Sequence, residues 1–118
     1  MRLFVDVPKI YLHRRPVDFR KQINGLSVIV EEDLSKSPFE ESLYVFVNGS
    51  RNRVKILFWQ RNGFCLWLKR LEKDKFAWPK HLTQDLIELT EEELNWLLSG
   101  FDLWRQPPHA RLHYTSVR

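Results

Sequence analysis

The chain has 118 residues, of which 43% are hydrophobic and 29% are charged, with a formal net charge of +4. This length suits a single domain that buries more than about 60% of its unfolded surface, so neither a metal ion nor a disulfide is needed for folding. Cys65 is the only cysteine, Asp6 and Pro8 interrupt any secretory segment, and no apolar run has the length of a membrane span, so we expect a soluble cytoplasmic protein without membrane contact.

The charge is spread unevenly along the sequence. Residues 51–80 contain nine Lys and Arg residues and only two acids, whereas residues 31–50 and 81–104 are acidic. A basic segment beside acidic ones is typical of a protein that binds a polyanion, although a charge run is also often only a solvated face. Composition alone leaves both interpretations open.

A strand and a helix are predicted first. Residues 9–13 have the pattern of a short strand that ends before Pro16. Asp18 fits the N-cap of a helix that runs to about Asp33. The apolar residues of this helix recur at helical spacing and are Phe19, Ile23, Leu26 and Val30.

Three residues of this helix carry further expectations. Gly25 costs about 1 kcal/mol relative to alanine in a helix, which indicates a close approach to the sheet. Arg20 and Lys21 fall in the first turn, where the dipole disfavours cations but backbone amides can hold a phosphate. A solvated helix end, with Arg20 paired to Asp18 or another acid, explains them equally well.

Three strands are predicted next, after a loop over residues 35–42. Residues 43–47 form the first strand, and a four-residue turn would pair Asn48 with Arg53. The next two strands flank Asn62-Gly63, a sequence that predicts a type I′ hairpin turn because both central residues of that turn need positive φ.

This turn sets the register of the hairpin. It places Arg61 opposite Phe64 and Lys55 opposite Arg70. Opposed like charges destabilise a sheet, so a partner that carries negative charge would relieve them. Glu72 or another acid of the chain could equally supply that charge.

Alternation of side chains along the strands separates two faces. One face is nearly all apolar and suits a core: Val45, Val47, Val54, Ile56, Phe58, Trp67 and Leu71. The other interleaves apolar and aromatic residues with cations: Tyr44, Phe46, Lys55, Leu57, Trp59, Arg61, Phe64, Leu66, Leu68 and Arg70. Surfaces that stack single-stranded nucleic acid have such a composition, yet so many apolar residues also favour cover by another element or a partner chain.

Several short sequence motifs along this part of the chain, and the order in which they occur, are unusual enough to be specific. They are Asp18–Lys21, Gly25-Leu26, Lys55–Trp59, Asn62–Phe64, Lys69–Glu72 and Phe76–Pro79. Together they resemble the signature of the TnpB-type accessory proteins, which are encoded by the second open reading frame of insertion sequences of the IS-sixty-six class, beside a larger transposase. The resemblance covers roughly residues 10–80. It departs at Gln60, where the family usually has Asp, and at the Lys73-Asp74 turn, which lacks a glycine.

The resemblance implies a non-catalytic accessory protein for DNA transposition, with DNA and the transposase of the same element as partners. We expect nucleic-acid contacts from Arg20, Lys21, Arg51, Arg53, Lys55, Trp59, Arg61, Lys69 and Arg70. Lys69 lies on the other face and would have to reach around the sheet edge. The alternative is a protein adaptor that binds the transposase through its apolar face and tail, without substantial DNA contact, and a third reading is a small nuclease.

The C-terminal part reads as helical. Residues 83–87 could form a short turn or helix, and Thr90 with Glu93 forms a capping box. Gly100 should end the helix that follows the box. Its buried stripe is expected to be Leu94, Leu97, Leu98 and Phe101.

No catalytic constellation is visible. The chain lacks a glycine-rich phosphate loop and a nucleophile motif. His109 and His113 are four residues apart, but neither a helix pattern nor a second pair of ligands accompanies them. A nuclease would need carboxylates that converge on metal ions, and the acids here are explained by helix starts and loops. We therefore expect no enzyme activity, no cofactor and no metal site.

The predicted architecture is an α+β domain over residues 1–104. It consists of an antiparallel meander of three to four strands packed with one helix from each half of the chain. Residues 105–118 form a C-terminal tail without periodicity, of a kind that is often disordered alone and ordered by a partner.

Overall fold

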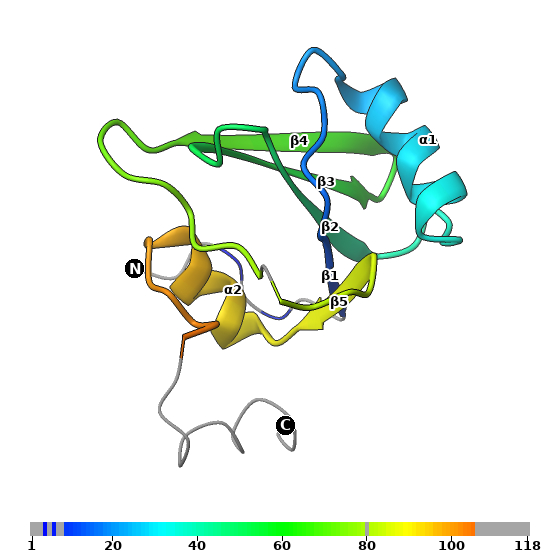
Figure 1. Ribbon diagram of the computed structural model, residues 1–118. Coiled ribbons are helices and arrows are strands. Elements are labelled where there is room, and N and C mark those ends of the chain that lie inside the picture. Colours follow the sequence, from blue (N-terminus) through cyan, green and yellow to red (C-terminus); the bar gives the residue numbers. More distant parts are fainter. Residues whose placement is uncertain (1–3, 5, 7–8, 80, 106–118) are drawn as a thin grey trace.

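The computed structural model describes residues 4, 6, 9–79 and 81–105 of the chain (Figure 1). The described strands are β1 (Lys9–His13), β2 (Ser42–Val47), β3 (Arg53–Gln60), β4 (Gly63–Arg70) and β5 (Leu86–Leu89). The described helices are α1 (Ile23–Asp33) and α2 (Glu91–Leu98). None of the helices in this part of the chain combines the length and the apolar composition that crossing a membrane requires.

The strands form one mixed sheet in the order β4-β3-β2-β1-β5. β1 runs parallel to β2, and the other neighbouring strands are antiparallel. The predicted α+β class is confirmed. The predicted meander corresponds to β2, β3 and β4, and the sheet continues beyond it because β1 and β5 pair alongside β2.

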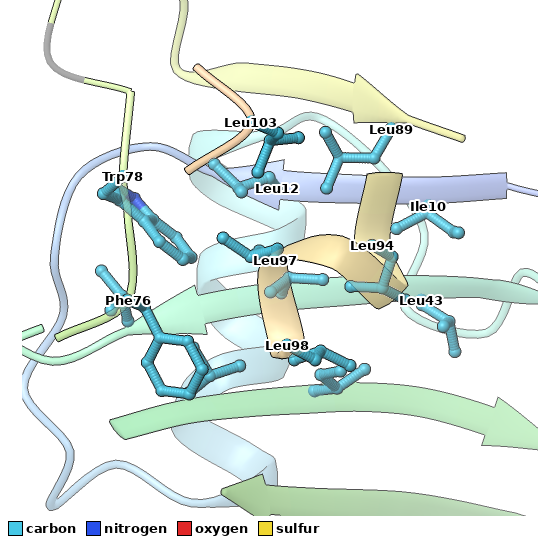
Figure 2. Packing of buried hydrophobic residues seen from close by; sticks show 14 residues of the cluster. Ile10, Leu12, Leu43, Phe76, Trp78, Leu89, Leu94, Leu97, Leu98 and Leu103 are labelled. Atoms are coloured by element: carbon cyan, nitrogen blue, oxygen red, sulfur yellow. The ribbon is translucent and has the colours of Figure 1, made fainter. Parts of the chain in front are cut away.

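One helix packs on each face of the sheet (Figure 1). On one face, α1 packs against the strands in a cluster that contains Leu26, Val30, Leu34, Tyr11, Tyr44, Phe46 and Leu57. On the other face, α2 lies over the larger cluster, which contains Leu94, Leu97, Leu98, Ile10, Leu12, Phe76 and Trp78 (Figure 2). Every residue of β2 is buried, because this strand lies in the middle of the sheet and is covered on both sides.

The turn between β2 and β3 has the predicted register. Val47 pairs with Val54, and the Asn48 N–H donates to the Arg53 carbonyl at 3.2 Å. Val45 and Val47 face the α2 side, as predicted. Tyr44 and Phe46, which alternate with them, face α1.

The hairpin turn between β3 and β4 lies one residue earlier than predicted. Gln60 pairs with Gly63, so that Arg61 and Asn62 form the loop. The positive φ belongs to Arg61, at 56°, whereas the rule for Asn-Gly turns places it at Asn62 and Gly63. The predicted pairing of Arg61 with Phe64 is therefore wrong.

The shifted turn moves the whole register by two residues. Trp59 faces Phe64, and the two rings meet edge-on with centroids 5.0 Å apart, whereas the predicted register pairs Phe64 with Arg61. Lys55 faces Leu68, so the predicted Lys55 and Arg70 pair is also wrong. Because side chains alternate with period two, a shift of two leaves every residue on its predicted face.

α1 begins later than predicted, at Ile23. The Asp18 carboxylate accepts the Arg20 N–H at 2.9 Å, and the Asp18 carbonyl accepts the Lys21 N–H at 3.0 Å. These local bonds make a separate turn, because a short acidic side chain competes with helical hydrogen bonding. The predicted end at Asp33 is confirmed.

Gly25 has a different neighbour from the one expected. A Cβ at this position would lie 3.0 Å from the Cβ of Lys21, so the Lys21 side chain, and not the sheet, makes the close approach. Glycine therefore lets the pre-helix turn fold back against the first turn of α1.

The prediction for residues 83–87 is wrong. β5 begins at Leu86 and pairs antiparallel with β1, where Leu89 lies opposite Ile10. Pairing to a strand that is distant in sequence thus decides the conformation of this short apolar run.

The capping box at α2 is confirmed. Thr90 Oγ1 accepts the Glu93 N–H at 3.1 Å, and Glu93 Oε1 accepts the Thr90 N–H at 2.8 Å. Gly100 follows the helix with φ 90°. Phe101 does not join the buried stripe, since it is 57% exposed and its ring lies on Trp96 with centroids 5.8 Å apart. The predicted histidine pair and the tail from residue 106 lie outside the described residues.

Candidate nucleic-acid interface

A groove of about 650 Å³ crosses β3 and β4 beside the segment that precedes α1. We call it the basic groove. Its lining consists of Phe19, Gln22, Arg53, Lys55, Leu66, Leu68, Arg70 and Glu72. Alternation along β3 and β4 turns the strand residues of this set to the α1 side of the sheet. Leu68 remains 55% exposed there, because α1 leaves this part of the edge strand uncovered.

Two arginines face each other at one end of the groove. Arg53 and Arg70 are paired residues of neighbouring strands, and both are exposed. Arg70 donates to Glu72 at 2.9 Å, whereas the Arg53 guanidinium has no ion pair within the described residues. Directly opposed like charges destabilise a sheet unless an anion lies near them. The groove thus has one more cation at this end than its own acid can balance.

Lys55 is held inside the structure. The residue is only 5% exposed. Its Nζ atom donates to the carbonyls of Phe19 at 2.9 Å and Lys21 at 2.8 Å, and to Gln22 Oε1 at 3.3 Å. Burial, and then the charge of Arg53, lowers the pKa of Lys55. The three donors of an ammonium group are all used here. We therefore correct the expectation that Lys55 contacts phosphate: it fastens the pre-helix segment to the sheet.

Arg20 and Lys21 belong to that pre-helix segment and not to a helical turn. Arg20 Nη2 lies 2.6 Å from Asp18 Oδ2, which confirms the reading of Arg20 as paired with Asp18. The Arg20 side chain, and then its backbone N–H, lowers the pKa of Asp18 to about 2. The Lys21 side chain is exposed and makes no hydrogen bond to other described residues, so it is the open cation at this border of the groove.

Two of the remaining candidates lie at the opposite end of the hairpin. Arg61 is in the loop beyond β3, eight positions after Arg53, which corresponds to a span of about 26 Å along the strand. Trp59 is half-buried, with its ring 5.1 Å from that of Phe39 and 5.0 Å from that of Phe64. Trp59 is therefore part of an aromatic cluster near the hairpin tip, and not a flat open platform.

The last two candidates leave the groove altogether. Lys69 lies on the α2 face, as its place in the alternation predicted, and Nζ donates to the Leu98 carbonyl at 2.8 Å. It satisfies a carbonyl at the end of α2, where a positive charge also suits the helix dipole. Arg51 lies in the turn between β2 and β3 with φ 60°, beside Phe76 and Trp78.

The structure thus brings Arg53 and Arg70 together, while Lys55 and Lys69 are used internally. Sequence reasoning missed Phe19 and Gln22 in the groove, because both were assigned to a longer helix. Alternation predicts this face for Leu68, although Leu68 is not among the expected contact residues. Within the described residues, no three His, Cys, Asp or Glu side chains are grouped so that they could hold a metal ion.

Comparison with known proteins supports the resemblance. Residues 8–108 match the model of the family described as IS66 Orf2 like protein, a span that contains both helices and all five strands. Two uncharacterized proteins of Sinorhizobium fredii, y4hO and y4jC, are each 31% identical to the chain, over 99 and 97 residues. The alignments cover 84% of both chains for y4hO and 82% for y4jC. No solved structure matches the chain. The chain therefore belongs to the IS66 Orf2 like family, and this membership indicates an accessory role in the transposition of an insertion sequence.

Proposed function

We propose that this accessory protein binds the DNA of its insertion sequence through the basic groove. The observation that carries the proposal is the pair of exposed arginines, Arg53 and Arg70, opposed on neighbouring strands with a single acid, Glu72, beside them. A DNA phosphate between the two guanidinium groups would neutralise the repulsion. Arginine suits this role because its planar fork can donate two parallel hydrogen bonds to one phosphate.

The other cations of this face extend the proposed contact. Lys21 borders the groove, and Arg61 lies on the same hairpin at its far end. A duplex that followed the hairpin from Arg53 to Arg61 would be contacted over about 26 Å, which corresponds to roughly three quarters of a turn of B-DNA. Arg20 is already paired with Asp18, so we assign it at most a long-range electrostatic contribution.

The direct test is binding of the purified protein to a duplex from the end of the insertion sequence, compared with an unrelated duplex. Each phosphate neutralised contributes about −0.9 to the slope of log affinity against log salt. With two to four contacts, we expect a slope of about −2 to −4. Affinity that does not change with salt would contradict phosphate binding by this groove.

A second candidate function is that of a protein adaptor for the transposase. The observation that favours it is the exposed ring pair of Trp96 and Phe101 at the C-terminal end of α2, on the face opposite the groove. Aromatic residues are enriched in protein interfaces.

If the protein is an adaptor, Phe101→Ser should weaken transposase binding tenfold or more, which a titration with the transposase in low and high salt would measure. The affinity of this variant for DNA, measured separately, should be unchanged.

We further propose that the protein has no catalytic step of its own. Carboxylates that start helices or pair with cations, such as Glu93 and Asp18, are engaged in structural bonds. We expect neither cleavage nor joining of DNA with magnesium or manganese ions. Metal-dependent cleavage that is lost on replacement of one Asp or Glu would favour the nuclease reading instead.

A further inference from the structure

A second pocket lies near the same end of the sheet as Arg53, but on the α2 side. Its volume is about 340 Å³, and the residues that matter here are Arg51, Lys75, Trp78, His81, Trp104 and Arg105. We call it the tryptophan pocket. Small-ligand pockets run from roughly 300 to 1,000 Å³, so this one has room for a group of about the size of one nucleotide.

The aromatic wall of the pocket is fixed by backbone hydrogen bonds. Trp104 Nε1 donates to the Ala77 carbonyl at 2.8 Å, and Trp78 Nε1 donates to the Arg14 carbonyl at 2.8 Å. Trp78 is only 5% exposed, whereas Trp104 is half-buried and leaves part of its ring accessible. Trp104 is therefore the ring on which a planar group can stack.

The charge of the pocket is positive and incompletely balanced. Arg51, Lys75 and Arg105 contribute cations, and among the described residues of the lining Asp102 is the one acid. The Asp102 carboxylate already accepts the N–H groups of Trp104 and Arg105, at 3.1 and 3.2 Å.

Arg51 is the member whose position most needs a ligand. Its Nε atom is buried and has no hydrogen-bond partner within the described part of the chain. Leaving a buried donor unpaired is costly, and more so for a charged group. The Arg51 side chain is only half-buried, lines the pocket and forms no ion pair with any described residue, so an anion in the pocket would balance its charge.

We propose that the tryptophan pocket holds one unpaired nucleotide at the end of a DNA strand. Arg51 and Lys75 bind its phosphate, and its base stacks on Trp104, since every base has a face suited to aromatic stacking. This inference rests on the proposed function, because DNA in the basic groove would bring the strand end to the pocket. Arg51 and Arg53 are two residues apart, at most about 7 Å along the chain, so that a single strand could pass over the sheet end between the two sites.

The test compares a blunt duplex with the same duplex carrying a three-nucleotide single-stranded extension, by fluorescence anisotropy. We expect the protein to bind the extended duplex roughly tenfold more tightly, a preference within the range that one stacked base provides. Trp104→Leu should abolish the preference and leave affinity for the blunt duplex unchanged. Arg53→Gln should weaken both DNAs by the same factor.

A pair of lysines in one loop provides the matched control. Lys75 lines the pocket, whereas Lys73, two residues before it, does not, and both side chains are exposed. Lys75→Gln should reduce the preference for the extended duplex about threefold or more, and Lys73→Gln should leave it unchanged. This comparison also keeps the test decisive if Trp104→Leu does not fold.

The outcomes separate the two proposals. Equal affinity for the two DNAs, or the same preference for the extended duplex in the Lys73 and Lys75 variants, would overturn the nucleotide-pocket proposal. Salt-dependent binding of the blunt duplex would in that case still support the groove proposal. Binding of the extended duplex that depends on Lys75, without any binding of the blunt duplex, would support the pocket and remove the groove.

Discussion

The α1 side of the sheet has a covered half and an open half, although the sequence pattern is the same in both. In the covered half, α1 and the segment before it bury Phe46, Leu57 and Lys55. In the open half, where the first residue of β3 pairs with the last residue of β4, Arg53 and Arg70 are exposed. Alternation therefore tells which face a residue occupies, but the position of a helix decides whether that residue supports the fold or meets a partner.

Lys55 and Arg53 make the difference concrete, since they are two residues apart on one strand face. The Lys55 ammonium group donates all of its hydrogen bonds to the segment from Phe19 to Gln22. The Arg53 side chain makes no hydrogen bond to any described residue. If this comparison is right, changes at Lys55 should affect stability and changes at Arg53 should affect binding.

The largest effect on stability is expected for Lys55→Met. The change leaves the carbonyls of Phe19 and Lys21 without their donor, and an unsatisfied buried polar group costs about 1–3 kcal/mol. We expect a loss of about 3 kcal/mol in the free energy of unfolding, measured by urea denaturation. Arg53→Gln should change it by less than about 0.5 kcal/mol. Equal effects of the two variants would break the division between covered and open halves.

A smaller loss is expected for Lys69→Met. Lys69 gives one hydrogen bond to the Leu98 carbonyl at the end of α2, and such a bond contributes about 1 kcal/mol. Unfolding should show that loss, and the affinity for DNA and its salt slope should stay at their original values. A flatter slope of log DNA affinity against log salt in this variant would show that Lys69 contacts phosphate after all.

The smallest effect concerns the acid that pairs with Arg20. The pKa of Asp18 is lowered to about 2, so the stability that it contributes is present above its ordinary pKa of 3.8 and is lost as the pH falls through about 2. Arg20→Gln removes the side-chain hydrogen bond and should move the pKa of Asp18 back toward 3.8. NMR titration of the carboxyl group would measure it, and an unchanged midpoint would show that the backbone N–H of residue 20 suffices.

Much of the fold could be predicted from local patterns. The faces of β2, β3 and β4 follow from alternation, and the start of α2 follows from the hydroxyl and carboxylate of Thr90 and Glu93. The hairpin register could not be obtained from the turn alone. The contact between Trp59 and Phe64 accompanies a loop in which Arg61, against the usual preference, adopts positive φ.

The candidate site was harder to predict because it depends on contacts between distant residues. Lys55 and Phe19 are 36 positions apart, and no sequence rule links an ammonium group to a particular carbonyl at that separation. Asp18 has the residue type of an N-cap but forms a separate turn, so the segment that borders the groove was predicted to be helical although α1 begins at Ile23. The Arg53 and Arg70 pair appeared only once the register was known.

The most direct measurement of the central claim is the salt dependence of DNA binding by Arg53→Gln/Arg70→Gln. Lys9→Gln/Lys36→Gln is the matched control, because it removes the same charge from two residues that do not line the groove. We expect the groove variant to fold normally and to flatten the slope of log affinity against log salt by about two units. The control should keep the original slope. A well-folded groove variant with unchanged affinity and slope would contradict DNA binding by the basic groove.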